Sequence, residues 1–125
     1  MTMPEAEGQL GVLDVMRNGA HTLELTGELD IASFPVLEAA AGRLIAGGAR
    51  SLTVDLHDLQ FMDLAGLRAV LEVHERAEEV GCELRLIPGP WQVQSLFERT
   101  GLAKILPFQV TGGGRPLAAE QGTRS

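Results

Sequence analysis

Few side chains in this sequence are suited to catalysis or metal binding. The three histidines, His21, His57 and His74, do not lie at metal-ligand spacing from one another or from a carboxylate pair. The single cysteine, Cys82, has no histidine signature near it and is interpreted as a small buried hydrophobe. His74 falls on the apolar side of an expected helix, which favours a packed histidine. The sequence therefore predicts no catalytic residue, no metal site and no cofactor.

Carboxylates gather where the expected strands end: Glu28, Asp30, Asp55, Asp58 and Asp63. Aspartate is a preferred N-cap, so one interpretation is simply helix capping beside a solvated face. Neighbouring strands and the helices that leave them share one edge of a sheet, so Asp30 and Asp63 could instead belong to one surface. Both interpretations remain open from the residues alone.

A β-hairpin is predicted at the start of the chain. The runs 10–19 and 21–30 are β-like, and the second alternates apolar with polar residues. Asn18 and Gly19 lie between them, and both tolerate the positive φ that a two-residue hairpin turn requires. We therefore expect an antiparallel pair of strands.

Residues 33–49 are typical of an amphipathic helix. Ser33 is the expected N-cap, and Gly47-Gly48 is the expected stop. The apolar positions at helical spacing are Phe34, Leu37, Ala41, Leu44 and Ile45.

A second strand–helix unit follows. We expect a strand at 51–56, a loop at 57–60, and a short lead-in at 61–63 to a helix capped by Asp63 and closed by Gly81. The apolar stripe of this helix is expected at Leu67, Val70, Leu71, His74 and Ala77. At about 100° per residue, Leu64 would lie roughly 70° from that stripe, on its shoulder.

The third unit consists of a strand at 82–87 and a helix that ends at Gly101, followed by a short strand at 104–108. The order predicts an α/β fold: a small mixed sheet that begins with an antiparallel hairpin, with helices packed against it. We assign residues 8–110 to this domain and residues 111–125, which are Gly-rich and polar, to a flexible tail.

Composition excludes several classes of partner. Seventeen acidic residues against ten basic ones give a net charge of −7, which repels phosphate backbones. Nucleic acid is therefore not an expected partner. No apolar run approaches membrane-spanning length and the first ten residues do not resemble a secretory signal, so we expect a cytoplasmic protein without membrane insertion.

Three segments resemble the STAS domain family, whose best-known members are bacterial anti-sigma factor antagonists. They are LTGELDIASFPVLEAA at 25–40, TVDLHDLQFMDLAGLRAVLE at 53–72 and LFERTGLAKILPF at 96–108. Their order and spacing agree with the family over roughly residues 10–110. The resemblance implies a partner-switching module that binds an anti-sigma factor, usually a serine kinase of the histidine-kinase-like ATPase fold.

The resemblance also implies a phosphorylation switch, and this chain departs from it. In the family the kinase phosphorylates the serine directly after the aspartate at the helix start, and the phosphorylated protein then dissociates from the kinase. Here that position is Leu64 and the next is Ala65, so the usual phosphoacceptor is missing. Thr26, Ser33, Ser51 and Thr53 remain as hydroxyls elsewhere, without a context that singles one out.

Leu64 has two interpretations. It could pack against the loop or the hairpin and staple the helix start, or it could be an apolar anchor in a partner interface. On the second interpretation we expect the partner-binding residues to be Asp30, Asp63, Leu64, Ala65, Gly66 and Arg68. Gly66 would allow close backbone approach, and Arg68 would point to solvent.

The leading hypothesis is a non-enzymatic anti-sigma factor antagonist-like module whose partner is an anti-sigma factor or a related ATPase-fold kinase. The alternative is a structural STAS subunit of a stress-signalling or ABC-type lipid transport assembly. Binding of a small molecule or nucleotide is weaker, since no phosphate loop or basic pocket is evident in the sequence. A weak homodimer is left open.

Overall fold

A computed structural model describes residues 9–109. The predicted tail at 111–125 lies outside that range. The chain forms β1 (Leu10–Arg17), β2 (Ala20–Leu29), α1 (Phe34–Ala46), β3 (Ser51–Met62), α2 (Leu64–Val80), β4 (Glu83–Ile87), α3 (Trp91–Arg99) and a 3-10 turn, η2 (Leu102–Lys104). The α/β class is therefore confirmed.

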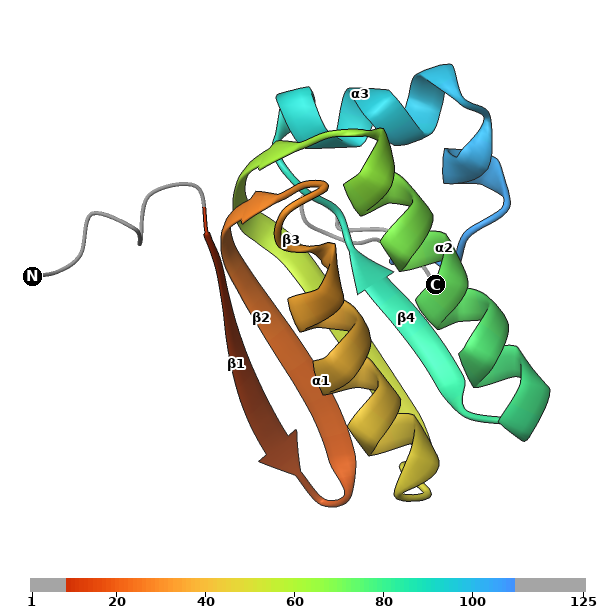
Figure 1. Ribbon diagram of the computed structural model, residues 1–125. Helices are drawn as coiled ribbons and strands as arrows, with labels where there is room; N and C mark the ends of the chain where they lie inside the picture. Colours follow the sequence, from red (N-terminus) through yellow and green to blue (C-terminus); the bar gives the residue numbers. More distant parts are fainter. Residues whose placement is uncertain (1–8, 110–125) are drawn as a thin grey trace, which may run out of the picture.

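The strands form one mixed sheet in the order β1-β2-β3-β4 (Figure 1). β1 and β2 are antiparallel and are joined at Asn18 and Gly19, whose φ angles are 53° and 81°. The hairpin is thus the predicted one. The β2–β3 and β3–β4 pairs are parallel, because a helix crosses over between the strands of each pair.

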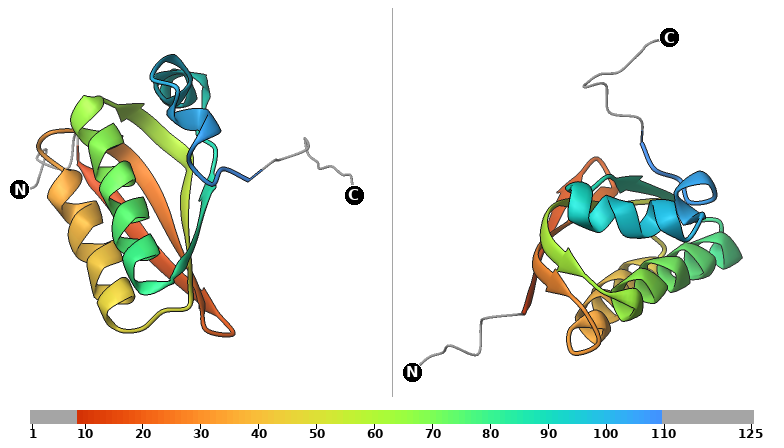
Figure 2. Two further views of the ribbon diagram at one scale, coloured as in Figure 1. Left: turned by 90° about the vertical axis from the view of Figure 1, so that its right-hand side faces the viewer. Right: turned by 90° about the horizontal axis from the view of Figure 1, so that it is seen from above.

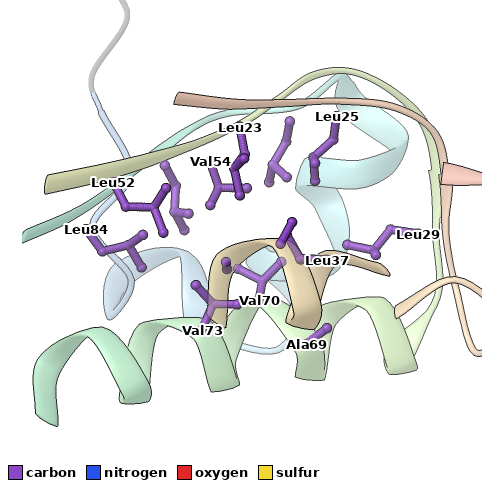
Figure 3. Close-up of a cluster of buried hydrophobic side chains, with 14 of the residues drawn as sticks. Leu23, Leu25, Leu29, Leu37, Leu52, Val54, Ala69, Val70, Val73 and Leu84 are labelled. Atoms are coloured by element: carbon purple, nitrogen blue, oxygen red, sulfur yellow. The ribbon is translucent and has the colours of Figure 1, made fainter. Parts of the chain in front are cut away.

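Helices α1 and α2 cover one face of the sheet, while α3 and η2 lie across the sheet from them near the end of β3 (Figure 2). The core is the layer between the sheet and the two long helices (Figure 3). Leu23 and Leu25 of β2 and Leu52 and Val54 of β3 are at most 1% exposed there. Burial of such aliphatic side chains is the main stabilising term of a domain this size.

The predicted loop at 57–60 is wrong, since β3 runs unbroken from Ser51 to Met62. Two bulges explain the error. In the register, Glu24 pairs with Asp55 but Thr26 with Asp58, and Gly27 pairs with Leu59 but Glu28 with Phe61. Each bulge breaks the alternation of buried and exposed side chains, so the segment reads as irregular.

The predicted strand at 104–108 is also wrong. The amides of Ile105 and Leu106 donate to the carbonyl of Leu102, so the helical turn continues where a strand was expected. The segment joins the sheet through one isolated parallel bridge, Phe108 with Leu86, in which the amide of Leu86 donates to the carbonyl of Pro107.

The buried stripe of α2 is rotated relative to the prediction. Its buried residues are Gly66, Leu67, Ala69, Val70, Val73 and Ala77. At about 100° per residue the centre of this set lies roughly 150° from Leu64, so Leu64 is nearly opposite the core rather than on the shoulder of the stripe. The sequence pattern missed the buried Gly66, Ala69 and Val73, whereas the expected Leu71 and His74 are only half-buried.

Candidate partner-binding surface

The carboxyl ends of β2 and β3 lie side by side and bring two aspartates to one rim. Leu29 pairs with Met62 in the parallel register, and the amide of Asp63 donates to the carbonyl of Leu29 at 3.3 Å. Asp30 follows Leu29 and Asp63 follows Met62. The shared rim inferred from the strand order is therefore present.

Asp63 is the N-cap of α2. Its Oδ1 accepts a hydrogen bond from the amide of Gly66 at 3.0 Å, and its Oδ2 accepts one from the amide of Ile31 at 3.3 Å. One carboxylate thus satisfies a free N–H of the α2 start and also joins it to the β2–α1 turn.

Asp30 shapes the turn into α1. Its Oδ1 accepts hydrogen bonds from the amides of Ala32 and Ser33, both at 3.0 Å. Ser33 was expected to cap the helix with its side chain, but its hydroxyl instead donates to the carbonyl of Glu28 at 2.7 Å. Because Ser33 is only 5% exposed, its hydroxyl is not presented to solvent.

Gly66 permits the close contact between α2 and β2. A Cβ built on Gly66 would lie 2.3 Å from the carbonyl oxygen of Leu29, a distance that atoms cannot adopt. Gly66 itself is buried, so it determines how closely α2 approaches β2 and does not face a partner directly.

Apolar side chains project from this rim. Leu64 is 65% exposed, and Ile31 of the β2–α1 turn is 69% exposed. A leucine that stapled the helix start would be mostly covered, so its exposure disfavours that interpretation. Arg68 is also exposed, one helical turn further along α2, as expected.

A groove of about 450 Å³ connects these residues between α1 and α2. It is lined by Ile31, Phe34, Glu38, Leu64, Ala65, Arg68, Ala69 and Glu72. Of the expected site residues, Leu64, Ala65 and Arg68 line the groove, whereas Asp30, Asp63 and Gly66 are not among its lining residues. A larger hollow of about 620 Å³ lies between β1 and α1 and includes none of them.

Two carboxylates meet across this groove. The pKa of Glu38 is raised above its ordinary value of 4.5, chiefly by a hydrogen bond with the side chain of Glu72, then by partial burial and by the negative charge of Glu72. The positive charge of Arg76 acts in the opposite direction. The groove is therefore lined by apolar side chains together with two carboxylates and the guanidinium of Arg68.

Ile31, Glu38 and Glu72 were not among the expected site residues. Ile31 carried no clear signal, since single exposed apolar residues are common on protein surfaces. Glu38 and Glu72 carried none, because they approach each other only when α1 and α2 pack side by side.

The residues considered for catalysis or metal binding are dispersed. Within residues 9–109 no group of three or more His, Cys, Asp or Glu side chains could hold a metal ion. Nδ1 of His74 has no hydrogen-bond partner among the residues that the structure describes, and Nε2 is 3.5 Å from Glu78 Oε2. Cys82 is 6% exposed, and burial, followed by the charge of Glu83, raises the pKa of its thiol. In the described part of the chain no helix is long and apolar enough to cross a bilayer.

The fold is that of a small STAS-type domain. The chain belongs to the STAS domain family, since the family model described as "Mlab, STAS domain" matches residues 13–107.

Its curated relatives bear names of the same kind. BtrV of Bordetella bronchiseptica, named as an anti-sigma factor antagonist, is 34% identical over 83 residues, which is 66% of this chain and 72% of BtrV. The anti-sigma-F factor antagonist RsfB of Mycobacterium tuberculosis is 30% identical over 59 residues, and this match spans 47% of the chain and 48% of RsfB. The Staphylococcus aureus anti-sigma-B factor antagonist is 27% identical over 86 residues, with coverage of 69% and 80%.

Solved structures share the fold. An anti-sigma factor antagonist from Mycobacterium paratuberculosis superposes with a TM-score of 0.75 at 22% identity, over 89% of this chain and 92% of that one. SpoIIAA in its unphosphorylated form gives a TM-score of 0.68 at 24% identity, over 79% and 86%. The chain is therefore an anti-sigma factor antagonist-like STAS domain.

Proposed function

We propose that this chain is a non-enzymatic binding module that engages an anti-sigma factor through the rim at the start of α2, without the usual phosphorylation switch. The observation that carries the proposal is Leu64. The resemblance to the family places Leu64 where other members carry the phosphorylated serine, and Leu64 is 65% exposed beside the exposed Ile31. The names of the relatives support the class of partner, and such a partner implies a cytoplasmic location. The structural-subunit alternative has no comparable support.

The physics of the switch explains why Leu64 matters. Phosphorylation of a serine here would add about two negative charges at the docking rim, enough to oppose a complex fitted to the neutral form. Leucine has no hydroxyl group, so it cannot be phosphorylated. In their place it offers an apolar side chain, and desolvated apolar anchors are among the residues that contribute most to interfaces. Binding is then constitutive with respect to this position.

Leu64→Asp tests the proposal. Affinity for purified anti-sigma factors of the source organism, measured by isothermal titration calorimetry, should fall on the order of 5- to 150-fold. Val80→Asp is the matched control, because Val80 is 62% exposed at the other end of α2. Unchanged affinity in Leu64→Asp, or an equal loss in both variants, would remove Leu64 from the interface.

A further inference from the structure

A third concave feature lies at the opposite end of the molecule from the rim. It is a pocket of about 340 Å³ between the β1–β2 turn and the loop from α1 to β3. Figure 1 shows that turn and that loop at the end of α1 remote from the start of α2. The register brings the two segments together, since Ala20 pairs with Ser51 and His21 with Leu52.

The charged and titratable side chains that line this pocket are Arg43, Arg50 and His21, and its eight lining residues include no aspartate or glutamate. They come from α1, from the loop after it and from β2. Neither arginine takes part in an ion pair or a side-chain hydrogen bond found within residues 9–109. Two arginines thus line one pocket in a chain whose net charge is −7. The basic pocket that the sequence did not reveal is formed by the fold.

His21 is held in one orientation. Its Nδ1 lies 3.0 Å and 3.2 Å from the two carboxylate oxygens of Asp14, and its side chain is 17% exposed. Because a carboxylate accepts and does not donate, Nδ1 carries the proton of this bond. Asp14 lies outside the lining of the pocket, so it positions the imidazole without occupying the pocket.

Two glycines that line the pocket adopt a left-handed backbone conformation, which favours glycine. Gly19 and Gly48 have φ angles of 81° and 89°, and a Cβ built on either would meet nothing within 4 Å. The backbone itself does not attract an anion here, because the amides of Gly47, Gly48 and Ala49 already donate within the end of α1. The C-terminal end of a helix also carries partial negative charge. Any attraction must therefore come from the guanidinium groups.

We propose that this pocket binds a small phosphate-bearing anion. Guanidinium groups match the oxygens of phosphate in paired hydrogen bonds, and two of them from different segments select a compact anion with more than one charge. The volume is at the lower limit of ligand pockets, which suits a phosphoryl group on a small molecule rather than a polymer. The negative field of the rest of the chain opposes binding, so we expect modest, salt-sensitive affinity.

Titration of the ¹⁵N-labelled full chain with sodium pyrophosphate at constant ionic strength tests the proposal. Saturable amide shifts at Gly19, Gly48 and Ala49 are expected, with a Kd on the order of 1 mM or below. Arg43→Gln and Arg50→Gln should each raise this Kd about tenfold. Arg99→Gln removes the same charge from exposed α3 and should change it less than twofold.

Two outcomes would overturn the proposal. Shifts that are absent, or that weaken equally in Arg99→Gln, would mean that no specific site exists. The second outcome concerns lipid vesicles. The protein would sediment with phosphatidylglycerol vesicles but not with phosphatidylcholine vesicles, Arg43→Gln would abolish this sedimentation, and pyrophosphate would cause no amide shift. That combination would assign the pocket to a lipid headgroup rather than to a soluble ligand. Leu64→Asp should leave pyrophosphate binding unchanged, so this result is independent of the anti-sigma factor interface.

Discussion

The amide of Ile31 donates a hydrogen bond to Oδ2 of Asp63 across 32 residues of sequence, at 3.3 Å. This bond joins the turn after β2 to the start of α2. It holds the exposed side chains of Ile31 and Leu64 on one surface, because each directly follows one of the two rim aspartates. The stability and the geometry of the candidate interface therefore depend on the same carboxylate.

Asp63→Ala should lower the free energy of unfolding by about 1–2 kcal/mol, because the amides of Gly66 and Ile31 both lose their acceptor. Urea unfolding followed by circular dichroism measures the loss. Asp58→Ala is the control, since the Asp58 side chain is 68% exposed and bonds with exposed His57. Equal losses in the two variants would show that the cap contributes nothing.

Gly66→Ala should be destabilising by about 1–3 kcal/mol, because the new methyl group would collide with the backbone of Leu29 and force α2 away from β2. The control is Gly42→Ala in α1. There the nearest atom, at 2.9 Å, is the end of the flexible Arg76 side chain, and alanine favours the helix by up to about 1 kcal/mol. A neutral effect of Gly66→Ala in thermal unfolding would contradict the close approach.

Leu64→Ser should create a phosphoacceptor at the start of α2. Incubated with ATP and an anti-sigma kinase, the wild-type peptide that spans Leu64 should remain unmodified, while the serine variant should gain phosphate by mass spectrometry. Stability should change by less than about 0.5 kcal/mol, because Leu64 is exposed. Phosphate on another rim residue of the wild type would show that the switch has moved rather than vanished.

Glu38→Gln should raise stability slightly at neutral pH. Since the pKa of Glu38 is raised on folding, ionisation of its carboxyl costs the folded state free energy. That cost is absent in acid and develops as pH rises through 4.5 towards the higher folded value. Like-charge pairs at a surface are worth a few tenths of a kcal/mol, so the gain should be about that size near pH 7 and vanish near pH 4.

Thermal unfolding at both pH values measures this difference, with Glu79→Gln near the far end of α2 as the control. High salt should shrink the gain, because the repulsion between Glu38 and Glu72 is partly screened. A gain at pH 4 as large as at pH 7 would exclude the charge mechanism.

The class of fold followed from local features. Asn18-Gly19 turns the hairpin because both residues accept positive φ, and Asp63 starts α2 because a carboxylate binds free amides. Gly81 and Gly101 end α2 and α3 at positive φ for a similar reason. Each of these features depends on a few neighbouring residues, and so the amino-acid order alone was sufficient to find them.

Three features could not be predicted from neighbouring residues. They are the extension of β3 through 57–60, the single bridge of Phe108 and the buried face of α2. They depend on which strand or helix lies alongside, and parallel pairing joins residues about 30 positions apart. The same holds for both pockets. Glu38 and Glu72 line one groove, and Arg43, Arg50 and His21 line one pocket, only after the helices have packed on the sheet. Turns and caps are determined by a few neighbouring residues, whereas grooves and charge clusters are determined by the packing of segments that are distant in the sequence.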